Sequence, residues 1–152
     1  MISRRKLLGA IGLAPLALTM PRLAAAASPE VFSDAGLAIR GYDPVAYFTQ
    51  SAPVLGMAEY ALMWRGTMWH FASAASMEAF EMNPEAYAPQ YGGYCAFAMS
   101  RGAIATTVPE AWTIYEDRLY LNYSDFVRGQ WSNDIPGNIE LANGYWPGIL
   151  DA

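Results

Sequence analysis

The sequence predicts a single small α+β domain preceded by a removable leader. Strand-like and helix-like segments are interspersed, without the regular succession of a strand and a long helix that marks doubly wound folds. Two stretches have the pattern of β-hairpins, and several short helices begin at capping residues. The roughly 125 residues that follow the leader suffice for one hydrophobic core and are too few for two.

The first hairpin and its flanking elements are expected in the N-terminal half of this domain. Ser73 has the position of a helix N-cap, and Pro84 ends that helix because proline cannot continue the hydrogen-bond ladder. The expected elements are an apolar segment at 37–39, a turn at 41–44 leading into 45–48, a loop at 50–57, hairpin strands at 60–64 and 68–71 across a turn at 65–67, and a short turn or helix at 84–89.

The second half contains another hairpin and three helices. Gly102 is a typical C-terminal cap, and Ser124 is expected to cap the helix that follows it. The expected elements are a corner at 91–94, a short helix at 95–101, hairpin strands at 112–115 and 119–123 across 116–117, a helix from 124 to 131, and a last helix that starts near Pro136 and ends at Asn143-Gly144.

The N-terminus has the features of a twin-arginine export signal. Ser3-Arg4-Arg5-Lys6 precedes an apolar run from Leu7 to Leu18, which is too short to span a bilayer. The alanines at 24–27 suit a signal peptidase, so we predict cleavage after Ala26 or Ala27. An uncleaved membrane anchor is the alternative that this pattern leaves open.

Cleavage defines the predicted domains and location. Residues 1–27 are the twin-arginine signal peptide, and residues 28–152 form the mature domain. This domain is expected in the periplasm or another compartment reached by the twin-arginine pathway, with no stable membrane insertion after the signal is removed. Cys95 is the single cysteine, so packing must hold the fold without an internal disulfide.

The mature domain is strongly acidic. Cleavage removes four of the nine basic residues and none of the 14 acidic ones, so five arginines remain and the net charge is −9. No lysine remains, which excludes Schiff-base chemistry. The negative field opposes nucleic acid and anionic lipid as partners and is compatible with cations.

Several short motifs carry a family likeness. They are Asp43-Pro44-Val45, Trp69-His70-Phe71-Ala72-Ser73, Phe80, and Pro84-Glu85-Ala86-Tyr87. With the longer stretches 41–48 and 91–96, they resemble the YHS domain, and in particular its exported bacterial members. The resemblance implies a metal-associated module, because YHS domains accompany copper and heavy-metal pumps and multicomponent monooxygenases. It also implies a metal pump or an oxidase as the partner.

The chain departs from the metal-linked members of this family. Those members carry cysteines where this sequence has Ala46, Ala72 and Ser76, so a metal site here must use other donors. The remaining soft donors are His70, Cys95 and the methionines. Copper(I) accepts thiolate, imidazole and thioether ligands in few-coordinate geometry, whereas a closed zinc site needs four stronger ligands. We therefore predict copper rather than zinc.

Four side chains are the predicted metal ligands. In a strand over 68–71, Met68 and His70 point to one face and their neighbours to the other. Cys95 and Met99 are four residues apart and share one face of the expected helix. Packing of this helix on the hairpin would bring both pairs together. The scattered Met57, Met63, Met77 and Met82 are interpreted as packing residues.

Two other functions stay open. One is a metal-free small-ligand or protein-interaction domain with a buried Cys95, whose pocket would use Tyr91, Tyr94, Trp112 and Tyr120, although core packing is the favoured use of these aromatics. The other is an enzyme with His70 as general base beside Asp43, or with Cys95 as a nucleophile activated by His70. It ranks last, because no nucleophile elbow or zinc-protease helix is present. The distance between His70 and Cys95 separates these hypotheses, because close contact supports a metal or an activated-thiol site that uses both residues and wide separation excludes both sites.

Overall fold

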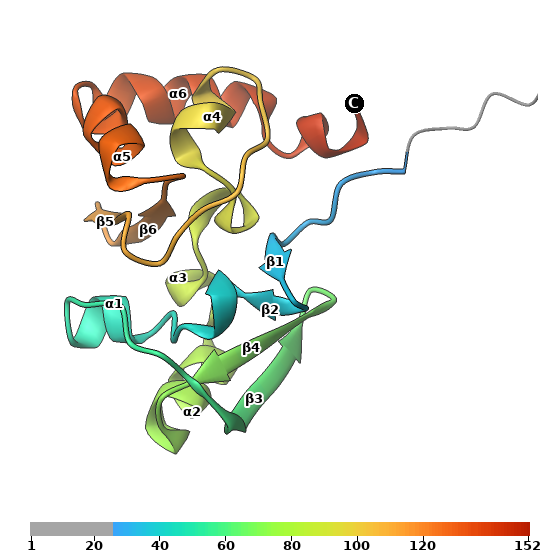
Figure 1. Cartoon of the computed structure of the whole chain (residues 1–152), viewed down its shortest axis with the longest axis vertical. Helices are drawn as coiled ribbons and strands as arrows, with labels where there is room; N and C mark the ends of the chain where they lie inside the picture. Colours follow the sequence, from blue (N-terminus) through green and yellow to red (C-terminus); the bar gives the residue numbers. More distant parts are fainter. Residues whose placement is uncertain (1–25) are drawn as a thin grey trace, which may run out of the picture.

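The computed structural model describes residues 26–152, and the predicted export signal up to residue 25 lies outside them. These residues form one α+β domain with a four-stranded sheet, a two-stranded sheet and several short helices (Figure 1). The predicted fold class is therefore confirmed. Within the described residues, no helix combines the length and the apolar character that crossing a bilayer requires. The domain boundary at residue 27 stays a prediction.

The four-stranded sheet and its helices take up the first half of the domain, in the lower part of Figure 1. Its elements are β1 (Ser33–Asp34), β2 (Leu37–Ala38), η1 (Ile39–Gly41), α1 (Ala46–Thr49), β3 (Met57–Trp64), β4 (Thr67–Phe71), α2 (Ala74–Met82), α3 (Pro84–Tyr87) and η2 (Gln90–Gly93). The strand order is β1-β2-β4-β3, so β4 is an inner strand.

The second half contains the smaller sheet and the three helices in the upper part of Figure 1. Its elements are α4 (Ala96–Ser100), β5 (Trp112–Tyr115), β6 (Arg118–Leu121), α5 (Asp125–Ser132), α6 (Ile135–Tyr145) and η3 (Gly148–Asp151). The start and the end of the described chain lie side by side, because the Ser28 amide donates to the Leu150 carbonyl at 2.8 Å.

Both predicted hairpins form, and local capping explains the start of the helix that follows each of them. Ser73 accepts a hydrogen bond from the Ser76 amide at 3.1 Å, and Ser124 accepts one from the Val127 amide at 3.2 Å. Each bond satisfies one of the free amides in the first turn of its helix. The two Ser caps are therefore confirmed.

The structure differs from the expected elements at three places. The β1–β2 hairpin was not anticipated, since two-residue strands are too short for a readable alternation. The expected loop at 50–57 ends early, because β3 begins at Met57 and crosses a register shift before Ala61. Helix α6 continues past 143–144 to Tyr145, and the Trp146 amide still donates to Ala142 at 2.9 Å before Pro147 stops the helix.

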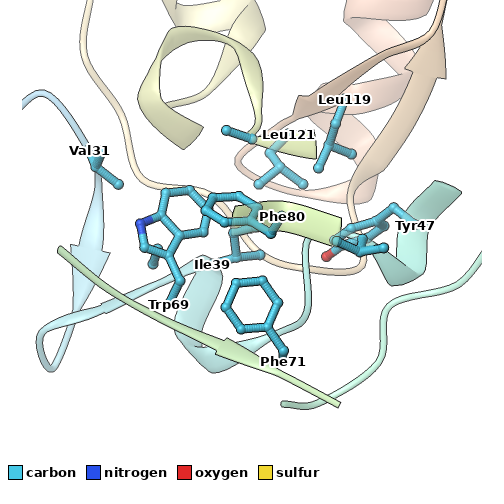
Figure 2. Close-up of a cluster of buried hydrophobic side chains, with 11 residues drawn as sticks. Val31, Ile39, Tyr47, Trp69, Phe71, Phe80, Leu119 and Leu121 are labelled. Atoms are coloured by element: carbon cyan, nitrogen blue, oxygen red, sulfur yellow. The ribbon is translucent and has the colours of Figure 1, made fainter. Parts of the chain in front are cut away.

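The core has two adjoining clusters. In the first, Phe80 of α2 packs at a tilt against Phe71 of β4, with ring centroids 5.1 Å apart, and Leu119 and Leu121 of β6 lie over them (Figure 2). The second cluster lies between α4, α5 and α6, and its large members are Tyr91, Tyr94, Met99, Tyr120 and Trp131. Because β6 contributes to both clusters, the two sheets belong to one folded unit.

Asp43 connects the first turn to the end of β4. Its buried carboxylate accepts hydrogen bonds from the amides of Val45 at 2.8 Å and Ala46 at 3.3 Å, and from Ala72 at 2.9 Å. Each bond satisfies a backbone donor at the start of α1 or the end of β4. The Asp-Pro-Val motif is thereby explained by packing and hydrogen bonding, and Asp43 makes no hydrogen bond to His70 among the described residues.

Candidate metal site

The alternation of β4 places Met68 and His70 on one face of the sheet. Thr67, Trp69 and Phe71 are buried on the core face, whereas Met68 and His70 are half-buried on the opposite face. This agrees with the two-residue period of a strand. The sequence-based placement of the two donors on a common face is therefore confirmed, and this face carries no part of the two core clusters.

Met63 joins these two donors from the neighbouring strand. It lies directly opposite Met68 in the antiparallel β3–β4 pair, and its side chain is 63% exposed. Side chains directly opposite in such a pair lie on the same face, with Cβ atoms about 5 Å apart, and diagonal neighbours such as Met63 and His70 are separated by about 7–8 Å. We call Met63, Met68 and His70 the open-face cluster.

The interpretation of the scattered methionines as packing residues is wrong for three of the four. Met63 is 63% exposed, Met82 81% and Met57 42%, whereas Met77 does pack against the first core cluster. For Met63, the physical reason is the length of the turn. Only Arg65 and Gly66, both with positive φ, connect β3 to β4, and Trp64 therefore pairs with Thr67. A three-residue turn at 65–67 would pair Met63 with Trp69 and turn it toward the core.

Two glycines pack closely on His70. A Cβ atom on Gly56 would lie 2.7 Å from His70 Cβ and 2.6 Å from its carbonyl carbon, and a Cβ atom on Gly41 would lie 3.8 Å from His70 Nδ1. The two glycines are themselves joined, because the Gly56 amide donates to the Gly41 carbonyl at 2.9 Å. The backbone thus fixes the position of His70. Within the part of the chain that the structure describes, its imidazole makes no hydrogen bond to another residue.

Cys95 and Met99 have a different environment. They are 1% and 0% exposed, and the Met99 side chain packs in the second core cluster. Cys95 is the N-cap of α4: its sulfur accepts hydrogen bonds from the amides of Tyr123 at 3.3 Å and Ala98 at 3.5 Å, and its thiol donates to Asn122 Oδ1 at 3.5 Å. The Cys95 sulfur is therefore enclosed by backbone amides and a buried amide side chain.

The two predicted donor pairs lie in different halves of the molecule. Figure 1 shows β4 among the strands of the larger sheet and α4 beside α5 and α6. The structure therefore does not bring the four predicted ligands together, and the metal roles of Cys95 and Met99 stay predictions. His70 is also not among the hydrogen-bond partners of Cys95, so the contact that an activated thiol needs is not formed.

The donor chemistry of the open-face cluster fits a soft monovalent metal. Across the described residues, no group of three or more His, Cys, Asp and Glu side chains has a metal-binding arrangement. Oxygen-rich sites for hard cations and closed zinc sites depend on such groups. Two thioethers and an imidazole are instead ligands that copper(I) accepts. Met63, Met68 and His70 therefore offer donors of a kind that copper(I) accepts.

The aromatic residues that were considered as a pocket serve mainly as core. Tyr91, Tyr94 and Tyr120 are buried in the second cluster, and Trp112 packs against the first. Burial raises the pKa of the Tyr91 and Tyr94 hydroxyls above their ordinary value. Their hydroxyls donate to Asn143 Oδ1 at 3.0 Å and to the Pro29 carbonyl at 2.8 Å. Core packing, the favoured interpretation, is confirmed for these four.

Comparison with known families agrees with the motifs. Residues 45–91 match the YHS domain profile, and no curated protein or solved structure matches the chain. The matched segment includes β3, β4, α2 and α3, and so contains the whole open-face cluster, whereas Cys95 and Met99 lie beyond it. The match supports the YHS domain family for this segment, a family often linked to metal handling.

Proposed function

We propose that this chain is an exported copper(I)-binding module of the YHS type. The observation that supports it best is the open-face cluster, in which two thioethers and one imidazole lie on the face of the β3–β4 pair opposite the core, with Met63 exposed and Met68 and His70 half-buried. The sequence supports export through the Arg4-Arg5 leader, and the family supports an association with metal.

The ligand charges favour a monovalent copper ion. Thioether and neutral imidazole ligands bring no negative charge, so the bound ion keeps its single positive charge near the surface of an acidic domain. Soft sulfur donors select copper(I), whereas oxygen ligands suit calcium and magnesium. Because Met63 is mostly exposed, the ion is held where a partner protein has access to it. A metal pump or an oxidase is the partner we propose.

Competition titration with a chromogenic copper(I) chelator, under ascorbate, tests the proposed function. The purified protein is compared with Met63→Leu, Met68→Leu and His70→Gln variants. Leucine nearly conserves the volume of methionine and removes its sulfur. Met82→Leu is the matched control, since Met82 is 81% exposed at the end of α2 and does not belong to the open-face cluster.

One equivalent of copper(I) is expected to bind, and each cluster variant should bind at least about tenfold more weakly, or about 1.4 kcal/mol. Met82→Leu should bind like the unchanged protein. No copper(I) binding would contradict the proposal and leave a metal-free binding domain. A loss confined to a Cys95→Ser variant would also contradict it and assign the metal to the Cys95–Met99 pair.

A further inference from the structure

A small cavity opens between the β3–β4 turn and the C-terminal segment, and its volume is about 180 Å³. Four aromatic residues border it: Trp64 and Trp146 are half-buried, whereas Trp69 and Tyr91 are buried in the core. Its charged lining residues are Glu30, Arg65, Glu85 and Arg118. The cavity is therefore bordered by two half-buried indoles and by two residues of each charge.

The two arginines of the cavity are not equivalent. Arg65 donates to Glu30 Oε1 at 2.8 Å and to Glu85 Oε1 at 2.7 Å, and its guanidinium lies 4.5 Å from the Trp64 ring centroid. Both carboxylates at the cavity are thus paired with this one cation. Arg118, at the start of β6, makes no ion pair or hydrogen bond within the described residues, and its side chain is exposed. It remains available to an anion.

The backbone gives the cavity a fixed wall. Gly92 has a φ of +62°, and a Cβ atom there would lie 1.9 Å from the Glu30 carbonyl oxygen and 3.2 Å from the Trp146 ring. The Gly92 carbonyl also accepts a hydrogen bond from the Phe32 amide at 2.9 Å. This close approach requires glycine. The segment around Glu30 is thereby held against the 90–93 corner, so the cavity is preformed.

We propose that this cavity binds a small aromatic monocarboxylate. Its carboxylate would pair with Arg118 in the two-bond geometry that guanidinium groups favour, and its ring would pack on the half-buried Trp64 and Trp146. The size fits one ring, because a cavity of about 150 Å³ holds benzene in another protein. Glu30 and Glu85 disfavour a second negative charge on the ligand.

This site is separate from the open-face cluster. Trp69 lies on the core face of β4, opposite to Met68 and His70. A Met63→Leu variant is therefore expected to keep carboxylate binding, so the failure of one proposal is distinguishable from the failure of the other.

Titration of the full protein with benzoate, followed by tryptophan fluorescence and by amide shifts in NMR spectra, tests the site. Benzamide serves as the neutral analogue and phthalate as the dicarboxylate. Arg118→Gln removes the proposed anchor. Arg101→Gln is the control, because it removes the same charge from an exposed arginine that stacks on Phe97 outside the cavity.

Benzoate is expected to bind with millimolar affinity, in keeping with its few heavy atoms. Its Kd should rise at least about tenfold in Arg118→Gln and stay within about twofold in Arg101→Gln, since only the first loses the ion pair. Absence of benzoate binding would overturn the proposal. Equal binding of benzamide or phthalate, or unchanged binding to Arg118→Gln, would overturn it as well.

Discussion

The two regions that carry the predicted donors differ in burial: the region around α4 is enclosed in the core, and the open face of β3–β4 is partly exposed. Cys95, the N-cap of α4, and Met99 within α4 are 1% and 0% exposed, whereas Met63, opposite Met68 on the open face, is 63% exposed. Alternation correctly placed Met68 and His70 on a common face, whereas Cys95 is the non-helical N-cap of α4 and both it and Met99 are buried. What decides between core residue and ligand is whether another element covers that face, and local spacing contains no such information.

Met99 and Met63 also differ in how much their burial contributes to the stability of the fold. Burying a methionine side chain contributes roughly 1.5–3 kcal/mol to folding, so packing alone accounts for Met99. Met63 gains little from burial, and packing therefore does not explain its thioether. An exposed thioether beside Met68 and His70 is what the proposed copper(I) site requires, and this contrast is what the following predictions test.

The largest expected effect is on core stability. Met99→Ala should lower the free energy of unfolding by about 2–5 kcal/mol, because it leaves a cavity in the second core cluster. Met63→Ala should lower it by less than about 0.5 kcal/mol, as at other surface positions. Urea unfolding followed by circular dichroism measures both. Comparable losses of unfolding free energy in the two variants would contradict the distinction between the buried Met99 and the exposed Met63.

The second effect concerns the reactivity of the Cys95 thiol. Enclosure by Asn122 and two backbone amides should slow its modification by a disulfide reagent at least about 100-fold relative to the urea-unfolded protein. The rate of thiol release in native buffer and in urea measures this protection. Native protein that reacts as fast as unfolded protein would show that Cys95 is accessible.

The third effect concerns the glycine that packs on His70. Gly56→Ala should destabilise the fold by about 1–3 kcal/mol and weaken copper(I) binding, because its methyl group would displace the His70 backbone. Gly129→Ala in α5 is the control. Nothing lies within 4 Å of the position that its added methyl group would take, so we expect a gain of up to about 1 kcal/mol. Thermal unfolding and copper(I) titration of both variants check this.

The smallest of these effects is a dependence on pH. Burial, with smaller contributions from Glu110, Tyr42 and Asp43, raises the pKa of Tyr47 above its ordinary value of 10.0. The unfolded chain therefore loses this proton at lower pH than the folded protein, and stability falls as the pH rises above about 10, by at most about 1.4 kcal/mol per pH unit.

Tyr47→Phe tests this contribution. The variant loses the hydrogen bond from Tyr47 to the Pro109 carbonyl, at 2.9 Å, which should cost about 1 kcal/mol near neutral pH. Its stability should then fall less steeply above pH 10, as urea unfolding at several pH values would show. An unchanged slope would contradict the assignment to Tyr47.

Elements with local signals were predictable from the sequence. Ser73 and Ser124 cap their helices as expected, and the Glu116-Asp117 turn joins the strands of the second hairpin. The β1–β2 hairpin was missed, since β2 is held by a parallel pairing of Leu37 with Met68 rather than by local periodicity.

The candidate site was only half predictable, and the turn shows why. Met68 and His70 follow from alternation within one strand, but Met63 depends on the register between two strands. That register rests on a two-residue turn with a positive φ at Arg65, a conformation uncommon for a residue other than glycine. The covering of Cys95 by Asn122 and Tyr123 depends on tertiary contacts 27 and 28 residues away.

NMR spectra of methyl-¹³C methionine protein, titrated with silver(I) as a redox-stable substitute for copper(I), test the central claim most directly. One spectrum reports the buried Met99 and the open-face Met63 and Met68 together. We predict that the methyl signals of Met63 and Met68 shift with one equivalent of silver, while those of Met82 and Met99 stay in place. A shift of Met99 without Met63 and Met68 would contradict the account and place the metal beside Cys95.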